Sequence, residues 1–285
     1  MFSGFRAFVV DDLGFHFKPV SMPANEEPQS VLRTGKMMKV IFHESFYEVY
    51  TMDPAAESGR MEAVIDVVRS RVELVNAEPA SEKDLLAVHT KTQVESVRSM
   101  GLYPIASLAA GGAIQAATLG LSEPAFGLIR PPGHHASAGS CWGFCYFNNM
   151  AVALEHLRRT KKIQTAYVLD IDLHFGDGTV NILGGRDWVK VHNVEANDRE
   201  AYLEEVKREM EHCKVDLIGV SAGFDNHERD WGGTLRTDDY GEIGRMVQEA
   251  ARRAGGGCFG ILEGGYNHKV LGHNVMALIE GLSGK

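Results

Sequence analysis

From residue 39 onward, short apolar runs alternate with longer segments in which apolar residues recur at helical spacing. The apolar runs are continuous rather than alternating, which is typical of strands buried on both faces of a parallel sheet. The predicted strands are residues 39–43, 125–130, 166–172, 187–193, 215–223 and 258–265. This order of elements predicts an α/β domain, in which helices cover both faces of a mainly parallel sheet.

The segments between these runs predict the helices. Residues 58–75 (SGRMEAVIDVVRSRVELV) show helical spacing, with Ser58 as the candidate N-cap. Residues 104–121 are rich in small side chains, which suit a closely packed helix. Further helices are predicted near 149–159, 198–212 and 237–254 and at the C-terminus.

The first residues differ from the rest of the chain. Residues 1–37 contain prolines and the acidic step PANEEPQ, without clear periodicity. No repeat and no linker interrupts the remainder. We therefore expect an N-terminal arm or extension, residues 1–37, followed by a single domain, residues 38–285.

Composition excludes several classes of function. The chain of 285 residues carries a net charge of −9 and has no basic patch, which argues against a nucleic-acid partner. No run reaches the ~18 apolar residues of a membrane span, and the N-terminus lacks the order of a signal peptide. The four cysteines form no CxxC pair, as in a reduced protein. We expect a cytoplasmic protein without membrane contact.

Polar side chains gather where the predicted strands end. Ligands of open parallel sheets bind beyond the carboxyl ends of the strands, so we expect these side chains to lie together. They occur in the segments RPPGHH, DIDLHFGDG, SAGFDNHERDWGG and LEGGYN, and are His134, His135, Asp170, Asp172, His174, Asp177, Asp225, Asp230, Glu263 and Tyr266.

The segment DIDLH has two interpretations. Alternation along an extended chain would place Asp170, Asp172 and His174 on one side, where a carboxylate and an imidazole can reach one metal ion. Alternatively, the aspartates cap a strand end by accepting backbone N–H bonds. With Asp230 from another strand end, an Asp172/His174/Asp230 metal site is favoured, and three protein ligands with an open position are typical of catalytic zinc.

Two adjacent histidines after Pro-Pro-Gly cannot both face the core. Imidazoles held by carboxylates suit the proton transfers of metal-assisted hydrolysis, and Asp170 and Asp177 are the available carboxylates. Tyr266, after two glycines, is either an aromatic residue packed at a turn or a hydroxyl that donates to an oxyanion.

The aromatic residues after the histidine pair have less specific interpretations. Phe144, between Gly143 and Cys145, could line an apolar slot. For Trp142 and Phe147 we expect packing into the core.

Together, the segments RPPGHHA, GFCYFNN, DIDLHFGDGT, SAGFDNHERDWGG and LEGGYN resemble those of the histone deacetylase family, in family order from about residue 38 to the C-terminus. The branch of histone deacetylase-like and acetylpolyamine amidohydrolases is the nearest in kind. The resemblance implies the three-layer arginase/deacetylase fold, with an eight-stranded mainly parallel sheet flanked by helices.

The resemblance also implies the roles of individual residues. Asp172, His174 and Asp230 would bind one catalytic Zn²⁺, and Asp170 would help to hold a structural K⁺. His135 with Asp177 would be the general base and acid, and His134 with Asp170 its electrostatic partner. Tyr266 would polarise the acyl carbonyl, while Gly143 and Phe144 would line a tunnel for a lysine-like stem.

The chain departs from the family pattern at a few positions. Phe175 and Trp231 replace the usual His and Pro, and a long loop that carries one tunnel wall is missing after residue 193. Gly232 stands where polyamine-selective members carry a glutamate, which leans against polyamines. The expected partner is an acylated lysine-like amine, a polyamine or a peptide, and a homo-oligomer is possible.

Two rival functions are weaker. A binuclear ureohydrolase of the same fold needs bridging carboxylates in a DxHxD pattern, but Gly176 follows two residues after His174. A non-catalytic binding module would be favoured by loss of Tyr266 or of the histidine pair, and both are present.

Overall fold

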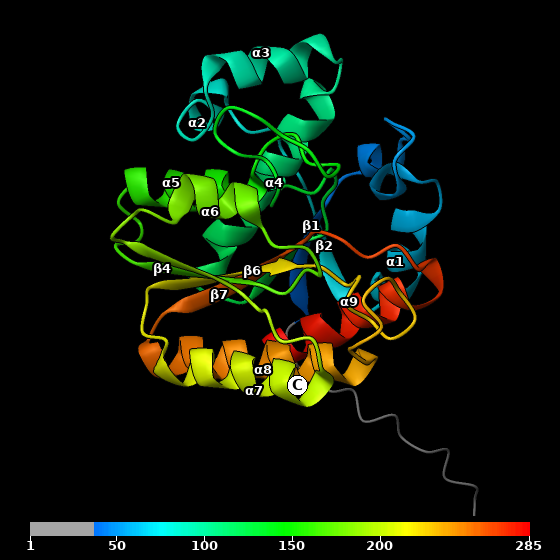
Figure 1. The fold of residues 1–285 in the computed structure, drawn as a ribbon, viewed down its shortest axis with the longest axis vertical. Coiled ribbons are helices and arrows are strands. Elements are labelled where there is room, and N and C mark those ends of the chain that lie inside the picture. Colours follow the sequence, from blue (N-terminus) through cyan, green and yellow to red (C-terminus); the bar gives the residue numbers. More distant parts are fainter. Residues whose placement is uncertain (1–36) are drawn as a thin grey trace, which may run out of the picture. The chain divides into compact units, whose positions relative to one another are not determined.

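Seven parallel strands form the sheet at the centre of the computed structural model, which describes residues 37–285 (Figure 1). Their order across the sheet is β2-β1-β3-β7-β6-β4-β5. The strands are β1 (Met38–Phe42), β2 (Val72–Asn76), β3 (Ala125–Gly127), β4 (Ala166–Asp170), β5 (Val189–Asn193), β6 (Leu217–Ala222) and β7 (Gly257–Leu262). Every pairing is parallel, which confirms the predicted class with one strand fewer than expected among the described residues.

Helices cover both faces of this sheet (Figure 1). One layer contains α4 (Tyr103–Gly120), α5 (Asn149–Arg159) and α6 (Asp177–Leu183); the other contains α7 (Arg199–His212), α8 (Thr237–Ala254), α9 (His268–Leu282) and α1 (Arg60–Val68), which packs on α9. The short elements are α2 (Glu82–Leu85), α3 (Lys91–Ser99) and the 3₁₀ turns η1 (Glu44–Tyr47) and η2 (Pro54–Ala56). The central strands β4 and β6 are fully buried, as their continuous apolar runs predict.

The single helix predicted over 58–75 is wrong. Helix α1 ends at Val68, and the following residues form the edge strand β2, whose Val72 pairs with Met38 of β1. The N-cap is Gly59, in the left-handed region at φ 85°, and not Ser58. Strand β2 is mostly exposed, so its sequence has too few buried positions to show the alternation of a strand next to a helix. Its conformation is decided by its pairing with β1.

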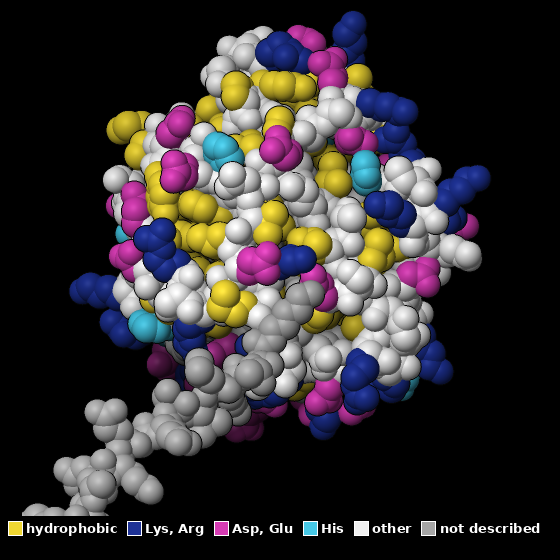
Figure 2. All heavy atoms as spheres, turned by 180° about the vertical axis from the view of Figure 1, so that it is seen from behind, with side chains coloured by type: hydrophobic (Ala, Val, Ile, Leu, Met, Phe, Trp, Pro, Cys, Tyr) yellow, Lys and Arg dark blue, Asp and Glu magenta, His cyan; other side chains and the backbone are white. Residues whose placement is uncertain are grey.

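Charged side chains of both signs are interspersed on the described part of the face in Figure 2. Among residues 37–285, no helix combines the length and apolar character that crossing a bilayer requires. The predicted arm, apart from Met37, lies outside the described residues.

Candidate active site

The predicted site residues lie beyond the carboxyl ends of four neighbouring strands. These strands are β3, β7, β6 and β4, adjacent in that order in the sheet. Each has the same direction, so the loops that follow them meet at one edge. The histidine pair follows β3, the DIDLH segment ends β4, Asp225 follows β6 and Glu263 follows β7.

Asp172, His174 and Asp225 form a group of potential metal ligands. Their donor atoms all lie within 4.8 Å of one another. His174 Nδ1 is 3.3 Å from Asp172 Oδ1 and 3.1 Å from Asp225 Oδ2. Both carboxylates are buried, and their hydrogen bonds raise the pKa of His174 to about 10. Two buried carboxylates and one imidazole that face a common point are a donor set for a divalent cation.

Asp230, the third ligand predicted from the sequence, makes other contacts in this structure. Its Oδ2 accepts hydrogen bonds from the backbone N–H groups of Tyr266 and Asn267, at 2.8 and 2.7 Å. Asp230 therefore holds the Tyr266 loop, and Asp225 is a second candidate for the third metal ligand. In the sequence, Asp225 lies closer to the end of β6 than Asp230 does.

The aspartates of DIDLH also show the capping role that the sequence left open. Asp170 Oδ1 accepts from the Asp172 N–H, and Asp172 Oδ1 accepts from the His174 N–H. Asp172 Oδ2 accepts a further bond from the Gly264 N–H at 2.8 Å. A Cβ at Gly223 would lie 2.2 Å from Asp172 Oδ2, so only glycine leaves room for this carboxylate. Capping thus fixes the orientation of the proposed ligand.

The two histidines have opposite electrostatic environments. His134 Nδ1 lies 3.2 Å from Asp170 Oδ2; burial opposes its charge, but Asp172 and Asp170 outweigh this and raise the pKa of His134 well above its ordinary value. His135 Nδ1 lies 2.6 Å from Asp177 Oδ1, yet burial and the neighbouring His134 lower the pKa of His135 to about 4. At neutral pH this pair offers one charged and one neutral imidazole.

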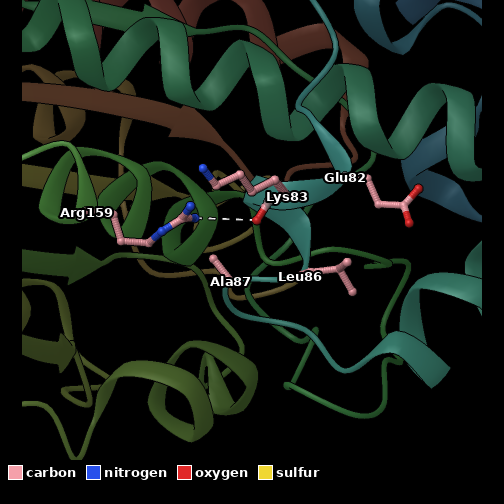
Figure 3. Close-up of a pocket in the computed structure, with 5 residues that line it drawn as sticks. All are labelled: Glu82, Lys83, Leu86, Ala87 and Arg159. Carbon is pink, nitrogen blue, oxygen red and sulfur yellow. Dashed lines mark hydrogen bonds between the residues drawn. The ribbon is translucent and has the colours of Figure 1, made fainter.

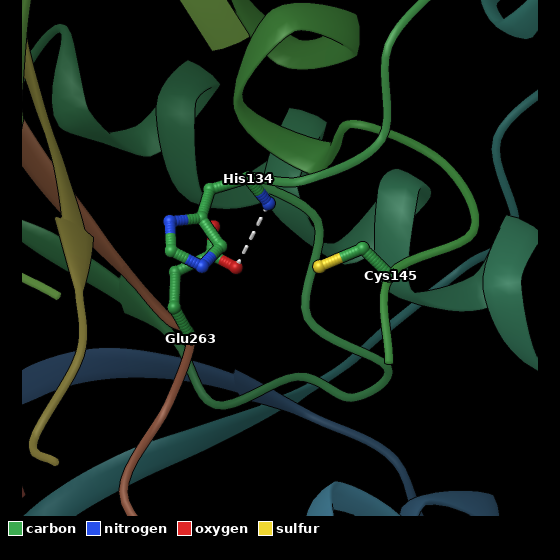
Figure 4. A group of neighbouring side chains, drawn as sticks. All are labelled: His134, Cys145 and Glu263. Carbon is green, nitrogen blue, oxygen red and sulfur yellow. Dashed lines mark hydrogen bonds between the residues drawn. The ribbon is translucent and has the colours of Figure 1, made fainter. Parts of the chain in front are cut away.

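Glu263 and Cys145 lie close to His134, the first residue of the histidine pair (Figure 4). Glu263 Oε2 accepts from the Gly133 and His134 N–H groups at 2.6 and 3.2 Å, and Cys145 Sγ accepts from the His135 N–H. Burial raises the pKa of Glu263 to about 7. Donor atoms of His134, Cys145 and Glu263 also lie within 4.8 Å of one another. The backbone hydrogen bonds that Glu263 and Cys145 accept fix the turn that carries both histidines.

Tyr266 lies among aromatic rings at the mouth of the site. Its ring stacks on Trp231 at a centroid distance of 4.1 Å and meets the edge of Phe144 at 6.1 Å. Burial raises the pKa of Tyr266 far above its ordinary value, so the phenol stays protonated. A Cβ at Gly143, where φ is 57°, would lie 2.4 Å from His135 Cδ2. Gly143 and Phe144 therefore both adjoin proposed catalytic side chains.

Trp142 contradicts the expectation that it packs into the core, because it is 56% exposed. Its ring stacks on His135 at 3.9 Å. The same expectation for Phe147 is confirmed, at 1% exposed.

Arg60 is a residue of the site region that the sequence analysis missed. It is fully buried, and it donates from Nε to the Gly265 carbonyl at 2.9 Å and from Nη2 to the Glu263 carbonyl at 2.7 Å. It thus ties α1 to the loop that carries Tyr266. In the sequence it is one arginine near a helix start, without a signal of its function.

Two hollows adjoin the site. A cavity of about 370 Å³ beside Asp172 is bounded by Phe175 and Asn193, where the missing loop would be. A second, of about 500 Å³, adjoins Trp231 and Tyr266. The hollow in Figure 3 lies between α2 and the end of α5 and includes none of the predicted site residues.

Comparison with known proteins identifies the family. The family model described as "Histone deacetylase domain" matches residues 55–202 and 189–282. A "probable deacetylase" from Methanothermobacter thermautotrophicus is 30% identical over 86% of this chain and 91% of its own. The "histone deacetylase-like amidohydrolase" of Pseudomonas aeruginosa is 30% identical over 79% of this chain and 75% of its own. The solved structure of an HDA15 HD domain superposes with a TM-score of 0.76 at 23% identity, covering 87% of this chain and 90% of that one, which shows the fold alone. On the strength of the family model and the full-length relatives, the chain belongs to the histone deacetylase family of hydrolases.

Proposed function

We propose that the protein is a zinc-dependent amidohydrolase that removes acetyl or related acyl groups from lysine-like amines. The observation that carries this proposal is the 2.6 Å contact of His135 with Asp177 beside the Asp172/His174/Asp225 group. A pair of side chains that can transfer a proton thus lies beside three side chains that can bind one metal ion, at the same edge of the sheet. Relatives named as deacetylases and as an amidohydrolase support the reaction class.

The residues present fit one zinc ion. Nitrogen and oxygen donors from three side chains are the protein part of a catalytic zinc site, in which water or substrate takes the fourth position. The Gly264 N–H holds the Asp172 carboxylate by a hydrogen bond. Gly223 and Gly264 have no Cβ that would occupy the space of this carboxylate. When bound by Asp172, His174 and Asp225, zinc would supply Lewis acidity to the substrate carbonyl and the attacking water.

His135 is the proposed general base and acid. With Nδ1–H donated to Asp177, its Nε2 keeps a lone pair that can accept a proton from water. A pKa lowered to about 4 keeps the ring neutral before this step. The proton then passes to the leaving amine. His134, whose Nδ1 lies 3.2 Å from Asp170, is the proposed electrostatic partner, which stabilises negative charge without transferring a proton.

Tyr266 is the proposed oxyanion donor. As water attacks the acyl carbon, negative charge collects on the carbonyl oxygen, and a fixed phenol can donate a hydrogen bond to it. The hydrogen bond that the Tyr266 backbone N–H donates to Asp230 and the ring contact with Trp231 hold the tyrosine in place.

The substrate is predicted to enter beside Gly143 and Phe144 as an extended lysine-like stem. Gly232 favours lysine over polyamine substrates. A potassium ion at Asp170 remains a prediction. An acetylpolyamine deacetylase is the alternative.

The test is an assay of the full-length, zinc-loaded protein with an acetyl-lysine peptide, an acetylpolyamine and longer acyl-lysines, measured as released free amine. We expect turnover of at least one acyl-lysine and a loss of ~10²–10⁴-fold in His135→Ala, with zinc content unchanged. Absence of turnover on every substrate, or near wild-type activity of the variant, would refute the proposed mechanism.

A further inference from the structure

Trp142 contacts both members of the proposed proton-transfer pair. Its ring stacks on the His135 imidazole at a centroid distance of 3.9 Å and an interplanar angle of 33°. Its Nε1–H donates a hydrogen bond to Asp177 Oδ2 at 2.9 Å. Asp177 uses its other oxygen, Oδ1, to contact His135. The three side chains thus form a closed set in which every member touches the other two.

Burial of apolar surface does not explain this placement. Trp142 is 56% exposed, whereas Trp188 lies in the core at 9%. A large aromatic side chain that remains in water gains little from packing. What it does gain is one hydrogen bond to a carboxylate and one stacked face, and both contacts are with groups of the proposed mechanism.

The geometry restricts two rotations. Asp177 is partly exposed, so without the indole its carboxylate could turn about its side-chain bonds and exchange partners with water. The indole N–H fixes Oδ2, which leaves Oδ1 directed at His135. The stacked ring also covers one face of the imidazole and so limits its tilt. An acid–base group must be held close to its productive geometry, and such supporting contacts provide this.

We propose that Trp142 is a positioning residue that acts on catalysis through Asp177 and His135 and does not contact the reacting atoms. The inference rests on the proposed function of that pair. Trp231 offers a comparison, because it is 53% exposed and stacks on Tyr266, and the contacts described for its side chain are with the rings of Tyr266 and His174.

The kinetic test uses Trp142→Phe, which keeps an aromatic ring but removes the N–H donor. We expect kcat to fall ~10-fold, with KM within about twofold and zinc content unchanged, for acyl groups of different size. In an Asp177→Ala background the same substitution should cause no further loss, because the carboxylate that it positions is gone. Trp142→Ala, which also removes the stacked ring, should lower kcat further than Trp142→Phe.

Three results would overturn the proposal. The first is a wild-type kcat in Trp142→Phe. The second is a raised KM with unchanged kcat, which indicates that Trp142 contacts the substrate. The third is that Trp142→Phe lowers kcat in the Asp177→Ala background as much as it does in the wild type.

A second measurement tests the contact without any change at Trp142. The chain has three tryptophans, so its ¹H–¹⁵N spectrum contains three indole signals. We expect the assigned Trp142 signal to shift in Asp177→Ala and to keep its position in the matched control Asp187→Ala, an aspartate beyond the end of α6 with no described contact to Trp142. An unshifted signal in Asp177→Ala overturns the contact. This measurement does not depend on turnover, so a wild-type protein that hydrolyses no acyl substrate refutes the proposed function and leaves the contact to be decided separately.

Discussion

At the scale of single residues, Asp225 and Asp230 occur in one loop but have different neighbours. Asp225 faces His174, while Asp230 binds the backbone of the Tyr266 loop. We expect Asp225→Ala to lose the bound zinc and nearly all activity. Asp230→Ala should keep the metal and lose activity through a displaced Tyr266. Metal analysis of the two purified variants checks this, and the reverse pattern would restore the ligand set predicted from sequence.

Tyr266 gives a second residue-scale prediction. Tyr266→Phe keeps the ring contacts with Trp231 and Phe144 and deletes only the hydroxyl. Loss of one oxyanion donor costs ~3–4 kcal/mol of transition-state stabilisation, so kcat should fall roughly 10²–10³-fold with little change in KM. Steady-state kinetics measure this, with Tyr47→Phe as a control, because the ring contact described for Tyr47 is with Phe42 and not with a site residue. A variant with full kcat would show that Tyr266 serves packing alone.

At the scale of elements, close packing of α4 depends on its glycines. A Cβ at Gly111 would lie 1.9 Å from the Glu78 carbonyl oxygen, so the helix and the segment after β2 could not keep their contact. Although alanine is the better helix former by ~1 kcal/mol, we expect Gly111→Ala to lower the free energy of unfolding by roughly 2 kcal/mol.

The matched control for that variant is Gly241→Ala in α8, where the nearest atom to the added Cβ is 3.5 Å away. It should be neutral or stabilising. Denaturant unfolding of both variants provides the comparison. Equal stabilisation by the two substitutions would contradict the close packing of α4.

Glu209 of α7 links two strands, since it accepts from Tyr167 of β4 at 2.6 Å and from Lys190 of β5. Burial opposes its charge, but these bonds outweigh it and lower the pKa of Glu209 from 4.5 to about 2. A depressed folded-state pKa stabilises the protein above the unfolded value, and this stabilisation is lost as pH falls through the folded value. Glu209→Gln should therefore cost about 1 kcal/mol at pH 7, and its difference from wild type should shrink between pH 4.5 and about 2. A difference that is constant across this range in urea unfolding would contradict it.

At the scale of the whole molecule, the proposed metal joins loops from two strands of the sheet. Asp172 and His174 follow β4, and Asp225 follows β6. A ligand that binds only the folded state raises its stability, by ~2.7 kcal/mol at a concentration 100 times its Kd. We expect one zinc per chain, and chelation should abolish activity and lower Tm by roughly 5 °C or more, both restored by zinc. Two equivalents of metal in the active protein would favour the binuclear alternative.

The sequence by itself determined the layer architecture and the edge of the sheet that carries the site. Continuous apolar runs in β4, β6 and β7 are a local consequence of burial on both faces, and residues just after them share one edge because parallel strands share one direction. The histidine pair and DIDLH lie directly in such segments, so their neighbourhood could be predicted.

Only the tertiary structure decided the contacts between segments distant in the chain. The strand β2 forms because it pairs with β1. In the sequence, the helical spacing of α1 continues into this segment, so the predicted helix is too long. Which of Asp225 and Asp230 faces His174 depends on the fold of one loop, in which Asp230 binds the backbone of the segment after β7. Arg60 reaches carbonyl groups some 200 positions away, and Trp142 stays exposed because its indole reaches Asp177. Local sequence fixes the period and burial of an element, whereas side-chain partners across such separations are set by the packing of the complete sheet and its helices.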